Sequence, residues 1–190
     1  MKTKNRIIVE QTMGFGKANL YSLLLIFPIT IVLLIPFIQV WGLETLELGK
    51  KYLVIYSIPV LLIGIILHEL IHGISWAYFI PEGMKSIKFG VVWKFLTPYC
   101  HCKVPLKVKH YKIGVAMPLI ILGILPLLIA VIFGSVALAY FGTIFTLAAG
   151  GDIITLIMLR KYKNECFVSD HPDKMGFYCE LITEETTHSD

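Results

Sequence analysis

Charged residues are scarce in this chain. They make up only 16% of its 190 residues, while hydrophobic residues make up 56%. An ordinary soluble domain has about 25% charged residues, so the composition argues against a typical soluble globular protein. The mean hydropathy of +0.76 points the same way. We therefore predict a polytopic membrane protein whose length suits one domain.

Several common functional signals are also missing. The sequence has no phosphate-binding glycine motif, no internal repeat and no basic–aromatic motif, so nucleic acid is not an expected partner. Residues 1–19 are polar and basic, and the apolar run that follows is long enough to span a bilayer, so no cleavable signal peptide is expected. The chain has four cysteines, and all fall on the side predicted below to be cytoplasmic, so we expect reduced thiols.

Four apolar segments are long enough to cross a membrane, which takes about 20 residues per helix. They cover residues 20–40, 53–80, 113–133 and 135–159, and the last two are divided near Phe133-Gly134-Ser135. The sequence thus predicts an all-α polytopic membrane protein with about four transmembrane helices. Residues 20–160 would form one protease-like membrane domain, with 1–19 and 161–190 as cytoplasmic segments.

Basic residues predict the orientation of these helices. Fifteen of the 17 lysines and arginines lie on one side of the four-span arrangement, and only Lys50 and Lys51 lie on the other. Because cytoplasmic segments are enriched in Lys and Arg, both termini and the loop 81–112 are predicted to be cytoplasmic. The expected location is the cytoplasmic membrane, and these side chains are expected to contact the bilayer surface.

The loop between the second and third spans contains one regular feature. Residues 86–105 are rich in β-branched and aromatic residues, and Ile87, Phe89 and Val91 alternate with other residues, which predicts a short β-hairpin. Its edge is expected either to pair with an extended substrate or only to cap the helices. The tail is expected to be disordered from residue 183 onward.

The sequence His68-Glu69-Leu70-Ile71-His72 lies inside the second apolar segment. Two histidines four residues apart share one face of a helix, and H-E-x-x-H is the zinc-binding pattern of metalloproteases, with the glutamate as general base. Ionisable residues inside a membrane are costly and therefore indicate a functional site. We predict His68 and His72 as zinc ligands and Glu69 as the general base. A structural histidine pair and a packing carboxylate are the alternatives.

A third ligand is needed, because catalytic zinc has three protein ligands and one open position. Asp152 is the only acid in the third and fourth spans. It lies eight residues before Arg160, as His72 lies eight residues before Ile80, so both are predicted about 10–15 Å from the same membrane surface. Asp152 is therefore the predicted third ligand; pairing with a hydroxyl or lysine is the alternative.

The other candidate residues carry weaker signals. Cys100-His101-Cys102 contains metal-binding residue types but has no established spacing, so no second metal site is expected. His110, His171 and His188 are expected to be solvated or interfacial. Residues 170–173 are expected to form a turn.

These residues resemble the site-2 protease superfamily of intramembrane zinc metalloproteases, in which H-E-x-x-H lies on one core helix and an aspartate on another. Gly150-Gly151-Asp152 matches only the aspartate of that second motif. The pattern H-E-x-x-H-G, a following strand-like loop, Pro118 in the next span and a late Gly-Asp is most similar to a small bacterial membrane family labelled "putative zincin peptidases".

The resemblance implies a zinc endopeptidase that cleaves a membrane protein or peptide in or near the bilayer. Two other functions are kept open: a catalytically inactive relative that binds membrane segments as a chaperone or regulator, and a metal or proton transporter. The sequence does not identify the substrate or the oligomeric state.

Overall fold

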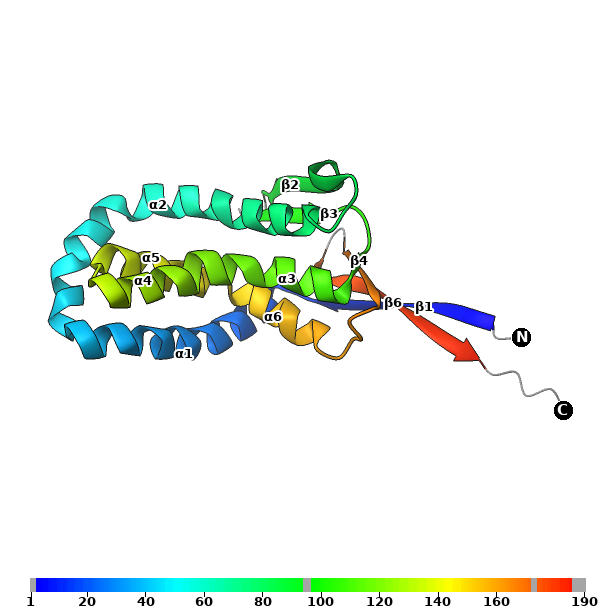
Figure 1. The fold of residues 1–190 in the computed structure, drawn as a ribbon, viewed down its shortest axis with the longest axis horizontal. Helices are drawn as coiled ribbons and strands as arrows, with labels where there is room; N and C mark the ends of the chain where they lie inside the picture. Colours follow the sequence, from blue (N-terminus) through cyan, green and yellow to red (C-terminus); the bar gives the residue numbers. More distant parts are fainter. Residues whose placement is uncertain (1–2, 94–96, 172–173, 186–190) are drawn as a thin grey trace.

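The computed structural model describes residues 3–93, 97–171 and 174–185. Long helices run side by side along the molecule, and all the strands gather at one end, beside both termini (Figure 1). The helices are α1 (Phe15–Trp41), α2 (Leu43–Ala77), α3 (Val108–Pro118), α4 (Leu125–Phe133), α5 (Val136–Ala148) and α6 (Gly150–Leu159). A π-helix, Leu119–Ile124, joins α3 to α4, so that residues 108–133 form one continuous helical rod.

Three helical segments are long and apolar enough to cross a membrane: Gly16–Trp41, Ser57–Ala77 and Val108–Phe133. α5 and α6 together form a fourth candidate, which is bent by 47°. Their apolar side chains face outward: Leu24, Ile66 and Ile132 are each more than 60% exposed. Such surfaces are stable in hydrocarbon but not in water, which makes the helices compatible with a bilayer.

The prediction of an all-α protein was wrong. Strands make up 19% of the chain and form two antiparallel sheets. One sheet has the order β1-β6-β5-β4, built from β1 (Thr3–Met13), β4 (Leu106–Lys107), β5 (Phe167–Asp170) and β6 (Met175–Glu185). β1 and β6 pair along their whole lengths, from Thr3 opposite Glu185 to Met13 opposite Met175.

The second sheet is a hairpin inside the loop 81–112. β2 (Ile87–Val92) pairs with β3 (Thr97–Cys102), and a short 3₁₀ helix, Gly83–Ser86, precedes them. The hairpin packs on α2, where a side chain at Gly73 would overlap the Phe89 ring at 2.6 Å. Residues 183–185, expected to be disordered, belong to β6. Residues 186–190, including His188, lie outside the described residues.

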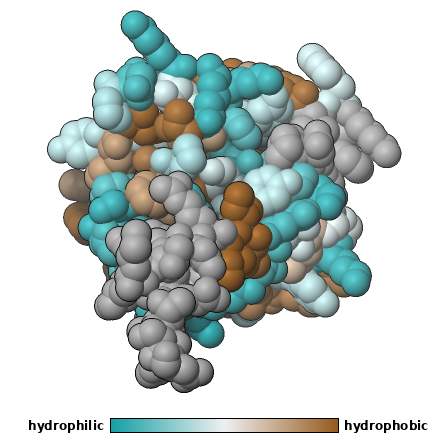
Figure 2. Space-filling model, turned by 90° about the vertical axis from the view of Figure 1, so that its right-hand side faces the viewer, coloured by the Kyte–Doolittle hydropathy of each residue, from teal (hydrophilic) through white to brown (hydrophobic). Residues whose placement is uncertain are grey.

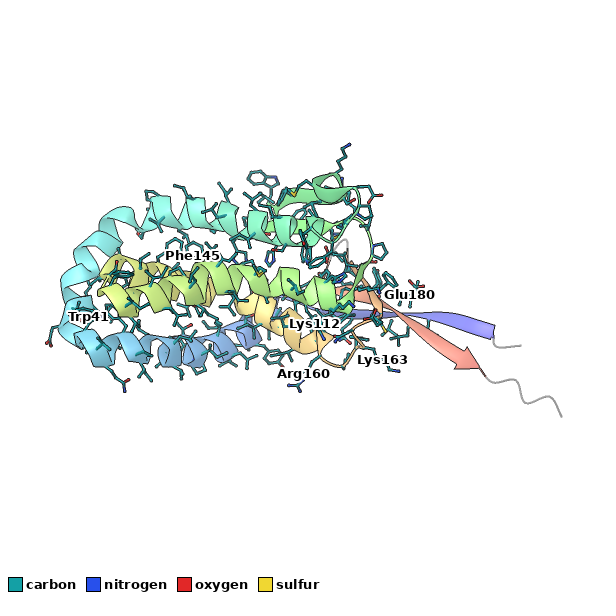
Figure 3. All side chains as sticks on the ribbon, in the orientation of Figure 1. Trp41, Lys112, Phe145, Arg160, Lys163 and Glu180 are labelled. Atoms are coloured by element: carbon teal, nitrogen blue, oxygen red, sulfur yellow. The ribbon has the colours of Figure 1, made fainter. Side chains whose placement is uncertain are left out.

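The strand-bearing end has a hydrophobic core of the kind found in soluble domains. Its members come from the ends of α2, α3 and α6 and from both sheets; among them Val108, Leu159, Phe177 and Cys179 are fully buried. Hydrophilic side chains dominate the surface of this end (Figure 2). Lys112, Arg160 and Lys163 lie here, whereas Trp41 lies at the opposite end and Phe145 lies between the helices (Figure 3).

Candidate metal centre

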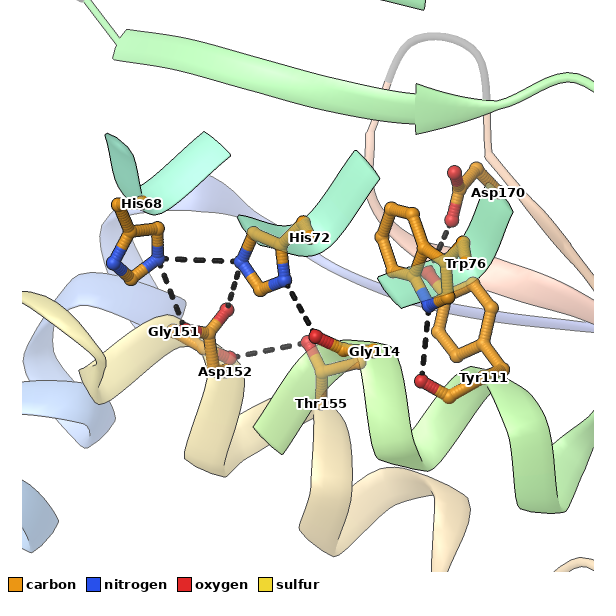
Figure 4. Close-up of polar contacts among 9 residues, drawn as sticks. All are labelled: His68, His72, Trp76, Tyr111, Gly114, Gly151, Asp152, Thr155 and Asp170. Atoms are coloured by element: carbon orange, nitrogen blue, oxygen red, sulfur yellow. Dashed lines mark hydrogen bonds and ion pairs between the residues drawn. The ribbon is translucent and has the colours of Figure 1, made fainter. Parts of the chain in front are cut away.

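His68 and His72 lie one turn apart on α2, and both side chains are buried. They point from α2 toward α6 and α3 (Figure 4). Their Nε2 atoms are 3.2 Å apart. A spacing of four residues places both rings on one helix face, and here the same nitrogen of each ring faces the same point.

Asp152 reaches that point from α6. Its Oδ2 lies 3.1 Å from Nε2 of His68, and its Oδ1 lies 3.3 Å from Nε2 of His72. Asp152 belongs to the first turn of α6, where the helix dipole favours a negative charge. The bend between α5 and α6 creates this helix start deep in the bundle. At Gly150, the first residue of α6, the helix lies close to α1, because a side chain there would press against Ser22 at 3.0 Å.

A backbone contact fixes the tautomer of His72. Its Nδ1 lies 2.9 Å from the carbonyl oxygen of Gly114 in α3. A carbonyl can only accept, so Nδ1 carries the hydrogen and, in the neutral ring, Nε2 presents its lone pair to Asp152 and His68. Metal-binding histidines are commonly held in this way by a partner on the other nitrogen. Trp76 stacks on His72 with ring centres 5.4 Å apart and restricts the ring further.

The chemistry of this cluster fits a bound cation. Each of the three residues offers one ligand atom, and these atoms lie within 4.8 Å of one another. Nδ1 of His68 is buried and has no hydrogen-bond partner among the described residues, and the buried Oδ2 of Asp152 has none there beyond its ion-pair contact with Nε2 of His68. Buried polar atoms without partners are costly, and a cation bound by Asp152 would relieve part of that cost. Two imidazoles and one carboxylate are ligands that zinc accepts.

Glu69 lies next to this cluster and is partly buried. It lines the same cleft as His68, His72 and Asp152. The backbone amide of Cys100, in β3, interacts with its carboxylate. The four predicted site residues are thus brought together, with Glu69 on the side nearer the hairpin.

Residues 61–167 match the family whose members are described as "Putative zincin peptidase". The chain belongs to this family. The match contains the whole cluster and the hairpin, and the family description indicates a zinc metallopeptidase. Comparison with curated proteins and with solved structures found no match.

The zincin-family cluster opens into a cleft of about 870 Å³. Besides α2, α6 and β3, the cleft is lined by segments that the sequence analysis assigned to the two tails. They are Gly16 and Asn19 at the start of α1, His171 and Lys174 between β5 and β6, and Met175 and Gly176 at the start of β6. Sequence reasoning missed these contributions. One pattern in the sequence could have revealed the strand β6 in the tail. Phe177, Cys179 and Leu181 alternate with polar residues, which predicts a strand with one buried face.

The remaining histidines and cysteines differ in their surroundings. His101 also lines the cleft, and its Nδ1 lies 3.6 Å from Asp170. His110 stacks on Phe79 outside the cleft, with ring centres 4.2 Å apart. The side chain of His171 is only 6% exposed and pairs with Glu10 at 3.3 Å, so of the two expected environments, solvated or interfacial, the solvated one does not apply. All four cysteines are free thiols.

Proposed function

We propose that this protein is a membrane-embedded zinc metallopeptidase that hydrolyses peptide bonds in or near the bilayer. The observation that carries the proposal is the convergence of His68, His72 and Asp152 on one point, beside Glu69 and inside a cleft. Membership in the zincin family supports the same activity. The three apolar helices support the membrane location.

His68, His72 and Asp152 would hold the zinc ion. Bound zinc supplies a Lewis acid that polarises a carbonyl group and makes water acidic enough to ionise near neutral pH. Glu69 accepts the proton of the attacking water on a carboxylate oxygen. It then passes the proton to the leaving nitrogen as the C–N bond breaks and the new C–O bond remains. Gly114 keeps Nδ1 of His72 protonated, so that Nε2 stays available as a ligand.

We further propose that the strand-bearing end faces the cytoplasm. Both termini and the hairpin lie at this end, together with Lys112, Arg160 and Lys163 (Figures 1 and 3). Positive charges favour the cytoplasmic side of a membrane. The cleft lies between the helices and this polar end, so water can reach Glu69 from the cytoplasm.

The edge of β3 that faces away from β2 would bind the substrate, whose backbone would replace the carboxylate contacts that the amides of this edge now make. The amide of Cys102 donates to Asp170, and that of Cys100 interacts with Glu69, so both amides point away from β2. An edge strand can pair with an extended peptide through its backbone. A peptide helix must unwind before cleavage, and pairing with β3 would hold the unwound segment beside Glu69.

The proposal is tested by incubating the zinc-loaded, detergent-solubilised protein with casein in water enriched in ¹⁸O. Hydrolysis places ¹⁸O in each new carboxyl terminus, which mass spectrometry detects. We expect labelled peptides from the native protein and from the control Glu82→Gln, whose side chain is exposed and outside the cleft. We expect none from Glu69→Gln. Equal labelling by Glu69→Gln would reject the proposed mechanism, and zinc-loaded native protein that cleaves nothing would favour the inactive relative.

A further inference from the structure

His101 is a cleft residue to which the mechanism above gives no role. It lies in strand β3 of the hairpin, and it lines the cleft together with His68, Glu69 and Asp152. Its side chain is 27% exposed. An imidazole at such a position can donate a hydrogen bond to a bound substrate.

Asp170 holds one side of the His101 ring. Nδ1 of His101 lies 3.6 Å from Oδ2 of Asp170, whose own side chain is 11% exposed. The Asp170 carboxylate is itself fixed at both oxygens. Oδ2 accepts from the backbone amide of Cys102 at 2.7 Å, and Oδ1 accepts from the hydroxyl of Tyr111. Because β3, α3 and β5 each supply one part of this arrangement, the carboxylate cannot rotate away from His101.

This geometry assigns different tasks to the two nitrogens of His101. Nδ1 faces the carboxylate of Asp170, which can only accept a hydrogen bond, so Nδ1 carries a hydrogen. Nε2 has no partner among the described residues. Lys88 is the cross-strand neighbour of His101 on β2, Cys100 and Cys102 flank it on β3, and Glu69 lies on the α2 side. Among the acidic groups of the described residues, Asp170 is the one that lies within 4 Å of a ring nitrogen of His101.

We propose that His101 is a further catalytic residue, which acts with a hydrogen on both ring nitrogens and donates a hydrogen bond from Nε2 to the carbonyl oxygen of the bond being cleaved, and that Asp170 is its positioning residue. The inference rests on the proposed peptidase function. His101 forms and breaks no covalent bond in this role. It stabilises the negative charge that develops on the oxygen as water attacks, and removal of one such donor typically lowers kcat by about 100- to 1,000-fold.

A purely structural role for His101 is the competing explanation. Asp170 already accepts hydrogen bonds from Cys102 and Tyr111, so it does not need His101 to satisfy its oxygens. A structural role predicts that substitution of His101 alters stability or binding in general. The proposed role predicts a selective loss of affinity for the transition state.

The test compares the zinc-loaded native protein with His101→Ala, His101→Gln and the control His110→Ala, a histidine outside the cleft. Zinc content, kcat and KM are measured with a casein-derived peptide that the native protein cleaves. Affinity is measured for a phosphinic analogue of that peptide, whose tetrahedral anionic group resembles the transition state. Gln keeps a polar side chain of similar size, so it preserves the test if the Ala variant does not fold.

We expect both His101 variants to retain zinc and to keep KM within about twofold, while kcat falls by about 100-fold or more. Affinity for the phosphinic peptide should fall in parallel with kcat. Asp170→Asn should also lower kcat with little change in KM. Native kcat in both His101 variants, or loss of zinc from both, would overturn the role of His101. Absence of cleavage by the native protein and by His110→Ala would instead overturn the proposed function itself.

Discussion

Nδ1 of His72 donates a hydrogen bond to the backbone carbonyl oxygen of Gly114, 2.9 Å away. This contact joins the H-E-x-x-H helix α2 to α3 at the level of the metal cluster. The residue that accepts this hydrogen bond is also a close contact between the two helices. A side chain at position 114 would lie 2.0 Å from Nε1 of Trp76 in α2. The close approach of α2 and α3 therefore depends on a glycine at this position.

Gly114→Ala should weaken both packing and metal binding. The added methyl group must displace the Trp76 ring or separate the helices, and overpacking of this kind costs about 1–3 kcal/mol. Loss of the Gly114 contact should lower zinc affinity by about 10- to 100-fold, as for other residues that orient metal ligands. Thermal unfolding and competition with a zinc chelator measure the two effects. Gly14→Ala is the control, because a side chain there meets nothing within 4 Å; equal behaviour of the two variants would refute the argument.

Tyr111→Phe should destabilise the strand-bearing end while leaving zinc in place. The Tyr111 hydroxyl donates to the buried Asp170 carboxylate, and its removal leaves an acceptor without that partner. Such a loss costs about 1–3 kcal/mol. We expect a lower unfolding temperature together with unchanged zinc content. Loss of zinc from this variant would show that Asp170 supports the metal cluster itself.

Gly64→Ala should destabilise the contact between α2 and α5. A side chain at Gly64 would lie 1.9 Å from Cζ of Phe145, which is fully buried. The ring has no free space to enter, so we expect a loss of about 1–3 kcal/mol, measured by denaturant unfolding in detergent. The double variant Gly64→Ala/Phe145→Leu should recover part of this loss, because the smaller side chain leaves room for the methyl group. Additive losses would contradict the predicted contact.

Cys100 should react slowly with iodoacetamide at neutral pH although it lines the cleft. Burial raises the pKa of its thiol well above the ordinary value, and the negative charges of Glu69 and Asp170 raise it further. Since the thiolate is the reactive form, the alkylation rate should keep rising beyond pH 9. Glu69→Gln removes one of the charges and should speed alkylation, whereas Glu165→Gln should not. A rate that levels off below pH 9 would contradict this environment.

The sequence was most informative where the relevant geometry is local. His68 and His72 share a face because they are four residues apart on one helix, and this required no tertiary information. The equal distances of His72 and Asp152 from the ends of their spans were enough to select Asp152, which the structure brings to 3.3 Å from His72.

Features that depend on distant parts of the chain were missed. β1 pairs with β6 across more than 160 residues of sequence, and no local pattern specifies that pairing. The polar, basic character of residues 1–19 concealed the β-branched residues Ile7, Ile8 and Val9 of β1. The fourth span was predicted as one helix, yet it bends by 47° between α5 and α6. Gly150 at this break packs closely against Ser22 of α1, a contact with a distant part of the chain that no local pattern specifies.

The most direct test of this account is the zinc content of the purified, reconstituted protein, compared with that of His68→Ala, Asp152→Ala and the control His110→Ala. We predict one zinc ion per chain in the native protein and in His110→Ala, and loss of zinc from both other variants. Zinc retained by Asp152→Ala would contradict the assignment of the third ligand. Failure of the native protein to bind zinc would contradict the metallopeptidase proposal.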